Sequence, residues 1–445
     1  MTQQEKFVHL TTAPIPKLML ELSAPTIFSM LITAFYNMAD TFFVGKINTS
    51  ATAAVGVVFS LMAIIQAIGF FFGHGSGNYI ARKLGEKDFE SAKTMASTGF
   101  FLCLIICSCL AITGLFYIKP LAYFLGSTDT IYPYAKDYMK YILIGFPITA
   151  SSFVLNNQLR YQGNAFYGMI GIVTGGLINI ALDPLFIFGF KMGVSGAALA
   201  TVLSQAISFS ILLTMTYKNS SLKISIKNFF VNSHYLIEIF KGGFPSLCRQ
   251  ALASIGTIVL NFSAGPFGDS AIAGMSIVNR IIMFANSAMI GFGQGFQPIC
   301  GFNYGAKLYS RVKEAFWFCV KYSFAFLVVT SIVMIIFAPQ FIHLFRDDAE
   351  VIAVGAPALI FQAITFPFNS WIVMSNMMLQ SAGRAVSASI LASARQGLTL
   401  IPLVLILSHF FGITGIQLAQ PIGDVITVFI AIPFTFSFLK SIKEK

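Results

Sequence analysis

Long apolar segments recur along the whole chain. A helix needs about 20 apolar residues to cross roughly 30 Å of hydrocarbon, and the sequence contains twelve segments of this kind. They lie approximately at residues 17–43, 52–78, 95–118, 133–158, 165–189, 194–217, 236–263, 271–300, 314–338, 352–379, 387–410 and 414–438. The sequence therefore predicts an all-α, polytopic membrane protein with twelve transmembrane helices.

The composition agrees with a membrane interior and excludes an ordinary soluble surface. Hydrophobic residues make up 56% of the chain and charged residues only 10%, whereas a soluble domain carries roughly 25% charged residues. A net charge of +11 would suit nucleic acid, but the basic residues are scattered between the apolar segments. Because a nucleic-acid surface needs clustered Lys and Arg, we expect no nucleic-acid partner.

The basic residues are distributed unequally between the loops. With twelve spans both termini lie on one side, and the segments on that side hold 18 lysines and arginines, Arg160 among them, against 6 on the other. Loops rich in Lys and Arg stay in the cytoplasm. We therefore expect a multi-pass protein of the cell membrane, plasma or inner, with both termini cytoplasmic.

The second half of the chain resembles the first at a nearly constant spacing. Pro25 corresponds to Pro245, LRYQGNA from Leu159 to LQSAGRA from Leu379, and GVSGAALA from Gly193 to GITGIQLA from Gly412. Each half holds six spans, so the halves share one orientation and a pseudo-two-fold axis along the membrane normal relates the two six-helix bundles. We expect an amino-terminal lobe at 1–217, a cytoplasmic linker at 218–235 and a carboxy-terminal lobe at 236–445, with the substrate path between the lobes.

Few acidic residues fall within the apolar segments. They include Glu21, near the inner end of the first segment, and Asp40, Asp183 and Asp424. A carboxylate in a bilayer costs at least about 2.5 kcal/mol on insertion scales, so each one needs a partner or a function. Counted from the outer ends of their helices at 1.5 Å per residue, Asp40 and Asp183 share a depth of about 10 Å.

Other oxygen-bearing side chains lie near these two acids. Asn179 precedes Asp183 by four residues, Tyr36 precedes Asp40 by four, and Thr201 has nearly the depth of Asn179. Residues four apart share a helical face. Carboxylate, amide and hydroxyl oxygens suit Na⁺, and two nearby carboxylates can also hold a proton. We therefore predict a site for Na⁺ or H⁺ in the first half, with no other metal site.

Alternatives to this site remain open. Asp183 precedes Pro184 and can bond local backbone at a kink, and Asp40 can cap the end of its helix. The corresponding positions of the second half are Leu260 and Pro402. A structural role common to both halves would predict acids there too.

Several further polar and soft side chains are candidates for the substrate path. Asp424 can line the space between the lobes. Methionines form an adaptable surface for varied ligands, although ordinary packing is the simpler interpretation of any single one. The candidates are Met275, Met283, Met289, Met374 and Met377. Arg249, Arg280 and Arg395 are expected to reach lipid headgroups, and His74 is expected at the membrane interface without clustered partners.

Four stretches of the sequence resemble the multidrug and toxic compound extrusion (MATE) family, and the similarity covers almost the whole chain. They are PTIFSMLITAFYNMADTFFVG, GSGNYIARKLGEKD, LINIALDPLFIFGFKMGVSGAALATVLSQ and FGQGFQPICGFNYGA. The resemblance implies a V-shaped pair of six-helix lobes. It also implies alternating access with export of cationic or amphipathic drugs in antiport with Na⁺ or H⁺.

Within the family, the chain is most similar to the branch with DinF-like and MepA-like members. The cation site of that branch corresponds here to Asp40, Asn179, Asp183 and Thr201. Tyr36 and Tyr138 are plausible supporting residues. Asn156 is a weaker one, because its helix places it near the cytoplasmic side.

Two other classes of function are weighed against drug export. A lipid-linked saccharide flippase can share the paired-bundle design, but its cavity needs cationic residues for a pyrophosphate. An intramembrane enzyme needs a nucleophile with a base, or a set of metal ligands, and no such combination is present at suitable spacing. We therefore expect no catalytic residues and no cofactor beyond the coupling ion. The expected partners are organic cations and membrane lipid, and we expect a monomer.

Overall fold

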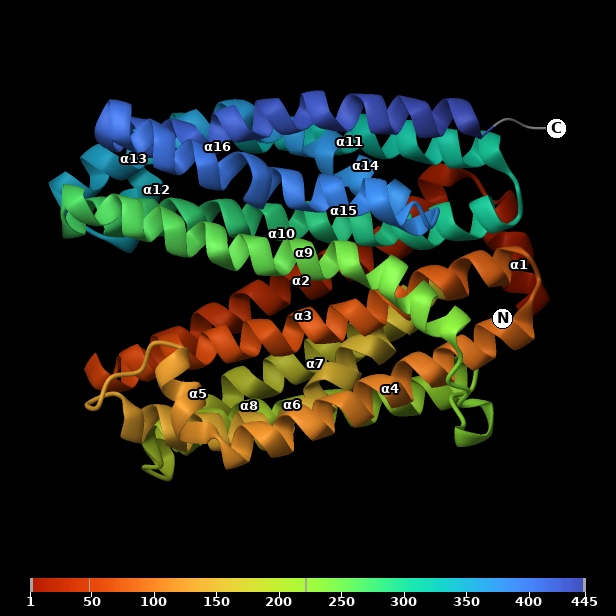
Figure 1. The fold of residues 1–445 in the computed structure, drawn as a ribbon, viewed down its shortest axis with the longest axis horizontal. Helices are drawn as coiled ribbons and strands as arrows, with labels where there is room; N and C mark the ends of the chain where they lie inside the picture. Colours follow the sequence, from red (N-terminus) through yellow and green to blue (C-terminus); the bar gives the residue numbers. More distant parts are fainter. Residues whose placement is uncertain (1–2, 48, 221, 443–445) are drawn as a thin grey trace.

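The computed structural model describes residues 3–47, 49–220 and 222–442, and it confirms the prediction of an all-α protein (Figure 1). No strand occurs among these residues. The first half holds α1 (Gln3–Thr12), α2 (Ile15–Gly45), α3 (Thr49–Gly85), α4 (Phe89–Phe116), α5 (Ile118–Phe124), α6 (Tyr132–Tyr161), α7 (Ala165–Pro184), the π-helix η1 (Leu185–Gly189) and α8 (Gly193–Asn219).

The second half repeats this pattern of long helices joined by short turns. It holds the 3₁₀-helix η2 (Ile226–Asn228), α9 (Ser233–Ala264), η3 (Gly265–Phe267), α10 (Asp269–Gly305), α11 (Tyr309–Ile336), α12 (Ala338–Phe345), α13 (Ala349–Thr365), η4 (Phe366–Phe368), α14 (Asn369–Ser381), α15 (Ala385–Ser393), the π-helix η5 (Ala394–Thr399) and α16 (Leu400–Ser441). The predicted division at 218–235 covers the end of α8 and the start of α9, and the division itself stays a prediction.

The helices account for the twelve predicted passes. Ten helical segments of the described chain are long and apolar enough to cross a membrane. One of them, Ala385–Ser441, has 57 residues and reverses direction at Gly412, whose φ of 58° and ψ of −135° break the helix. It therefore supplies two antiparallel passes. The twelfth is α9, whose 32 residues would span about 48 Å at 1.5 Å per residue, although its sequence is less apolar.

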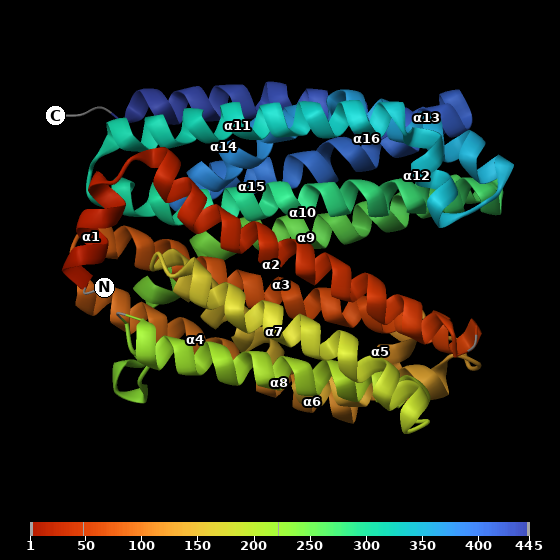
Figure 2. The same cartoon turned by 180° about the vertical axis from the view of Figure 1, so that it is seen from behind.

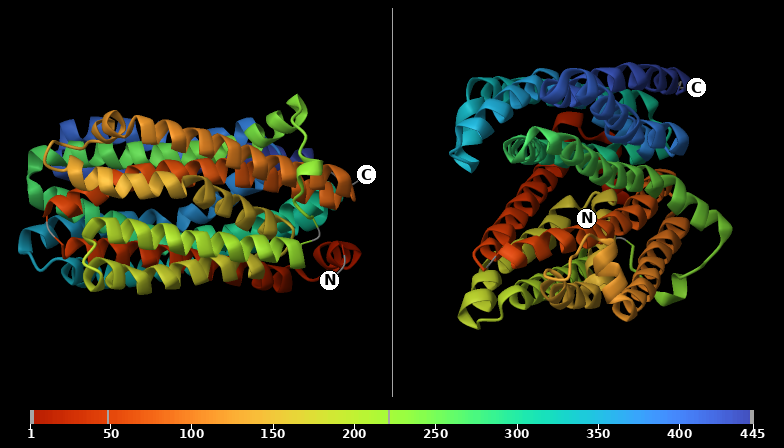
Figure 3. Two further views of the ribbon diagram at one scale, coloured as in Figure 1. Left: turned by 90° about the horizontal axis from the view of Figure 1, so that it is seen from below. Right: turned by 60° about the vertical axis from the view of Figure 1, so that its left-hand side comes forward.

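The helices form two bundles, α2–α8 and α9–α16. The bundles lie together at the end that carries both termini and spread apart toward the end with α5 and α12 (Figures 1 and 2). The segment between α8 and α9 lies outside the bundles at one edge (Figure 3). This arrangement confirms the V-shaped pair of lobes.

Small residues allow the bundles to meet closely at the terminal end. A Cβ atom on Gly305 would lie 2.0 Å from the carbonyl oxygen of Arg82, and one on Gly75 would lie 2.3 Å from that of Ile239. Only glycine fits at such backbone contacts between membrane helices.

Hydrogen bonds between the bundles are confined to this end in the described chain. Thr26 donates to the carbonyl oxygen of Gly291 at 2.6 Å, and Gln250 donates to the Gln66 side chain at 3.2 Å. The protein is therefore closed at the terminal end and diverges toward the other.

Candidate functional site

Two carboxylates of the first bundle are buried near its open end. Asp40 on α2 is 4% exposed and Asp183 on α7 is fully buried. The two charges lie close enough to interact electrostatically. Close packing of α2 on α7 brings them together, because a Cβ atom on Gly176 would lie only 3.2 Å from the ring of Tyr36. The structure thus places both acids inside the bundle and not in lipid.

The local sequence explains the irregular backbone that follows Asp183. Pro184 has no backbone N–H, so a regular α-helix does not continue through it. The chain instead forms the π-helix η1, in which the N–H of Phe190 bonds the carbonyl oxygen of Leu185 at 2.8 Å. The α8 helix then returns tightly alongside, with Gly196 against the backbone of Phe186. A π-helical turn of this kind is frequent at functional sites.

Asn179 connects α7 to α8. Its amide Nδ2 donates to Asp183 Oδ1 at 3.3 Å and lies 3.5 Å from Thr201 Oγ1. The Thr201 hydroxyl in turn donates to the carbonyl oxygen of Ala197 at 3.0 Å. The lone pairs of Thr201 therefore remain available to the cluster.

Two tyrosines complete the surroundings. The buried Tyr138 on α6 lies within electrostatic reach of Asp40 and Asp183 and close to Thr201. Tyr36 on α2 lies within electrostatic reach of Asp40. Six of the predicted residues, from four different helices, are thus brought together.

Asn156 is not brought to this cluster. Its amide nitrogen would lie 2.8 Å from a Cβ atom on Gly168. Gly168 precedes Asn179 by eleven residues on α7, which corresponds to about 16 Å along the helix.

Four buried oxygens of the cluster have no hydrogen-bond partner among the residues that the structure describes. They are Asp40 Oδ1, Asn179 Oδ1, Asp183 Oδ2 and the Tyr138 hydroxyl. No Lys, Arg or His of the described chain forms an ion pair with either aspartate. Buried polar groups are almost always paired, and oxygens of this kind are ligands for hard cations. The arrangement can therefore bind Na⁺ or share a proton.

Asp424 has a different setting from these acids. The Arg395 guanidinium binds it through Nε at 2.8 Å, and Gln420 donates to the same carboxylate oxygen at 2.8 Å. Both charged side chains are largely buried within the second bundle. Arg395 therefore pairs with a buried acid of its own bundle, whereas it was expected to reach lipid headgroups.

Most of the candidate methionines belong to the packed core of the second bundle. Met275, Met289, Met374 and Met377 are almost completely buried. A Cβ atom on Gly293 would approach the Met377 sulfur to 2.3 Å, so no space is left beside it. Met283 is 64% exposed and stands apart from this core. The structure does not gather these residues around one cavity.

Sequence reasoning places two charged or titratable residues too near the surface. Arg160 falls among the cytoplasmic loops in the sequence, yet it is only 2% exposed. His74, expected at the interface, is buried between the bundles, where its Nδ1 lies 2.7 Å from Ser246 Oγ. His74 follows a glycine and Arg160 follows a polar stretch, each at the end of an apolar segment. Such a pattern is found both in loops and in buried helix ends, so it does not distinguish them.

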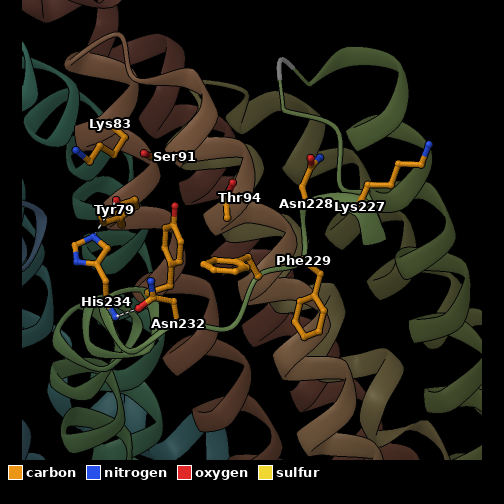
Figure 4. A pocket seen from close by; sticks show the side chains of 11 residues that line it. Tyr79, Lys83, Ser91, Thr94, Lys227, Asn228, Phe229, Asn232 and His234 are labelled. Carbon is orange, nitrogen blue, oxygen red and sulfur yellow. Dashed lines mark hydrogen bonds between the residues drawn. The ribbon is translucent and has the colours of Figure 1, made fainter.

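A pocket of about 520 Å³ lies at the terminal end, between the start of α4 and the segment leading into α9. Tyr79 and His234 lie side by side in its wall, with the Tyr79 hydroxyl 3.2 Å from His234 Nε2 (Figure 4). Lys83 in its wall is paired with Glu86 and Asp88. The pocket is separate from the buried carboxylates, which lie toward the opposite end of the bundle.

Comparison with known proteins agrees with the two-bundle design. The family model described as MatE matches residues 25–185 and again residues 245–406. The two matches begin at Pro25 and Pro245, the same pair that the sequence repeat aligns. This agreement confirms the internal repeat.

Curated relatives and solved structures match over nearly the whole chain. A protein named Multidrug export protein MepA from Staphylococcus haemolyticus is 27% identical, covering 98% of this chain and 96% of that protein. The protein of the same name from Staphylococcus saprophyticus is 26% identical, covering 95% and 94%. A structure described as the outward-facing conformation of a multidrug resistance MATE family transporter of the MOP superfamily has a TM-score of 0.92. It is 26% identical and covers 98% of this chain and 99% of that one.

These findings confirm the resemblance that the sequence motifs carry. The members of the matching family are secondary transporters and not enzymes, and the observed helices agree with a multi-pass membrane protein. With both halves matched by the same family model, the chain belongs to the MatE family, the multidrug and toxic compound extrusion transporters.

Proposed function

We propose that the protein exports drug-like small molecules, chiefly cationic and amphipathic ones, in exchange for Na⁺ or H⁺ by alternating access. Its relatives named multidrug export proteins and the matching transporter structure support export of small molecules. These relatives do not favour a lipid-linked saccharide flippase. Ion coupling is supported by the geometry of the first bundle.

One observation carries the coupling proposal: Asp40 and Asp183 are buried side by side with no cation of the described chain to neutralise them. Two nearby negative charges in a medium of low dielectric repel each other strongly. A mobile Na⁺ or proton removes this repulsion when it binds. Asn179, Thr201 and Tyr138 would hold the ion and orient the carboxylates.

The α2 helix gives this site a route to the rest of the molecule. Toward the terminal end, Thr26 bonds the backbone of α10, and a Cβ atom on Gly291 would lie 2.6 Å from Ile27. Toward the open end, the same helix carries Tyr36 and Asp40 against α7. Ion binding that shifts α2 therefore changes a contact between the bundles. Coupling requires only that ion and drug prefer different arrangements, and it is reciprocal.

The proposal is tested with purified protein in lipid vesicles. Efflux of an organic cation such as ethidium is followed with a Na⁺ gradient or a proton gradient imposed separately. We expect one gradient to drive efflux, and Asp183→Asn to reduce that efflux to the rate seen without a gradient. Asp137→Asn removes an exposed acid of α6 next to Tyr138 and should leave efflux unchanged. Full gradient-driven efflux in a folded Asp183→Asn protein would overturn the proposal.

The flippase alternative has a distinct signature in the same vesicles. It predicts movement of a lipid-linked saccharide between leaflets without an imposed ion gradient. Such movement, together with absent drug efflux, would favour the flippase.

We also propose that the protein lies in the cell membrane as a monomer with both termini in the cytoplasm. The excess of basic residues at the terminal end supports this orientation. The expected surroundings are lipid and drug, with no nucleic acid. Alkaline phosphatase fused after the last residue is active only outside the cytoplasm, so this fusion should be inactive. An active fusion would reverse the orientation.

A further inference from the structure

Arg160 is a buried cation that the coupling mechanism does not use. It lies in the last turn of α6, where Nη2 donates to Asn157 Oδ1 at 2.7 Å and to Gln297 Oε1 at 3.4 Å. Its guanidinium also lies 5.0 Å from the centre of the Tyr161 ring. All of these partners are neutral. The Nε atom is buried and has no hydrogen-bond partner.

A second arginine lies in the same neighbourhood. Arg249, half-buried near the middle of α9, donates from Nη1 to Asn376 Oδ1 at 3.3 Å. It interacts electrostatically with Arg160, and both arginines act on Tyr161 and on His74. Two guanidinium groups, one from each bundle, therefore share one buried region.

These arginines differ from others that lie inside the protein. Arg395 has Asp424 at 2.8 Å, and Arg82 has Glu238 at 2.8 Å. Within the described ranges, no carboxylate lies within 4.0 Å of Arg160 or Arg249. Burying a charge such as that of Arg160 without a counter-charge is strongly unfavourable, and the half-buried Arg249 adds electrostatic repulsion. The region therefore holds positive charge without a negative partner. A bound anion would supply that partner.

The region also lies where the bundles meet. Arg160 of α6 contacts Gln297 of α10, and His74 of α3 contacts Ser246 of α9. Gln250, the neighbour of Arg249, donates to the Gln66 side chain of α3 at 3.2 Å. Arg249 is partly exposed whereas Arg160 is only 2% exposed, so a molecule between the bundles would contact Arg249 first.

We propose that Arg160 and Arg249 form a binding site for an oxyanion, a carboxylate or a phosphate, carried by the transported molecule. The two arginines would then select among transported molecules by the oxyanion that each molecule carries. A guanidinium group matches the planar, bidentate geometry of such anions. The assignment to a transported molecule rests on the proposed export function, whereas the anion site itself does not.

The first experiment measures anion binding without transport. The melting temperature of purified protein in detergent is followed while sodium phosphate replaces sodium chloride at constant ionic strength. We expect phosphate to raise the melting temperature of the native protein. Arg249→Gln should abolish this rise, and Arg249→Lys should retain part of it. Arg346→Gln, which removes an exposed arginine, should behave as the native protein. An equal rise in Arg249→Gln, or none in the native protein, would overturn the site.

The second experiment asks whether the anion belongs to the substrate. Vesicle efflux is compared for norfloxacin, a zwitterion with a carboxylate, and ethidium, a cation without an acidic group. We expect Arg249→Gln to lower the ratio of norfloxacin to ethidium efflux at least tenfold, with no change for Arg346→Gln. An unchanged ratio, even with phosphate binding lost, would overturn the substrate assignment and leave a free inorganic anion as the ligand. Phosphate binding without any drug efflux would contradict the proposed function and support the anion site.

Discussion

The two bundles bury polar clusters at corresponding places, and the clusters differ in charge. In the first bundle, Asn179 lies beside the unpaired Asp183. In the second, the acid Asp424 is paired with Arg395. Gln420, the counterpart of Thr201, donates to that acid. One cluster carries an excess of negative charge, and the other is neutral.

The comparison shows that the same arrangement of helices can bury an acid with a cation from the chain or without one. Where the chain supplies Arg395, the acid is neutralised permanently and contributes to a fixed core. The corresponding position of the first bundle in the repeat is Gly175, which packs against Ser208. No side chain there can neutralise the aspartates. On the proposed mechanism, an ion from outside the chain supplies the neutralising charge, and its binding and release are coupled to transport.

The largest expected effect comes from removing the cation of the neutral cluster. Arg395→Gln leaves the Asp424 charge buried and unpaired, and this should lower the free energy of unfolding by about 3–5 kcal/mol. Thermal unfolding in detergent measures the loss. The double variant Arg395→Gln with Asp424→Asn should recover most of it and should still export drug with a gradient. A folded double variant that has lost gradient-driven export would place Asp424 in the coupling machinery and erase the contrast between the bundles.

A smaller effect should distinguish the two possible coupling ions in the charged cluster. Asn179→Ala removes an amide oxygen that accepts no hydrogen bond from the described residues. If Na⁺ is the ion, the half-saturating Na⁺ concentration for efflux should rise about tenfold, the equivalent of roughly 1.4 kcal/mol. A proton needs only the carboxylates, so a proton-driven protein should change much less.

Asn156→Ala provides the matched control for this experiment. It removes the same chemical group from the same bundle, but its site lies apart from the cluster. Efflux in this variant should keep the native ion dependence. An equal effect of both substitutions would mean that Asn179 acts through packing and not through the ion.

The smallest expected effect concerns Lys6 of α1, a lysine outside the membrane-spanning helices. Lys6 donates to the neutral Asn164 Oδ1 at 2.7 Å, and it forms no ion pair with an acid of the described residues. Burial lowers its pKa from 10.5 to about 8. The unfolded chain therefore binds more protons than the folded protein between these values, so the contribution of Lys6 to stability rises with pH from about 8 to 10.5.

Lys6→Met should remove this contribution. The melting temperature of the variant, measured relative to the native protein, should therefore fall as the pH is raised across that window. Lys119→Met, a change at an exposed lysine of α5, should show no such trend. If the melting temperatures of Lys6→Met and the native protein changed equally with pH, this result would contradict the lowered pKa of Lys6.

Much of the architecture could be predicted from local sequence, and the errors share a cause. The lengths of the apolar segments predict the passes, even across the reversal at Gly412, because a bilayer requires about 20 apolar residues per pass. The burial of Arg160 escapes such reasoning because it stands at the end of an apolar segment, where a cytoplasmic loop is the usual interpretation. Its contact with Gln297 joins residues 137 apart, and no local pattern indicates such a contact.

The sequence by itself determined the spans, the two-fold repeat and the scarcity of acids in the membrane. These features depend on composition within a segment or on spacing along the chain. It also placed Asn179 and Asp183 on one face, because residues four apart on a helix are neighbours. Only the tertiary structure decided which charges meet across helices, such as Arg395 with Asp424, and which remain unpaired. Membrane helices are apolar on most faces, so their periodicity does not specify how each one is rotated toward its neighbours.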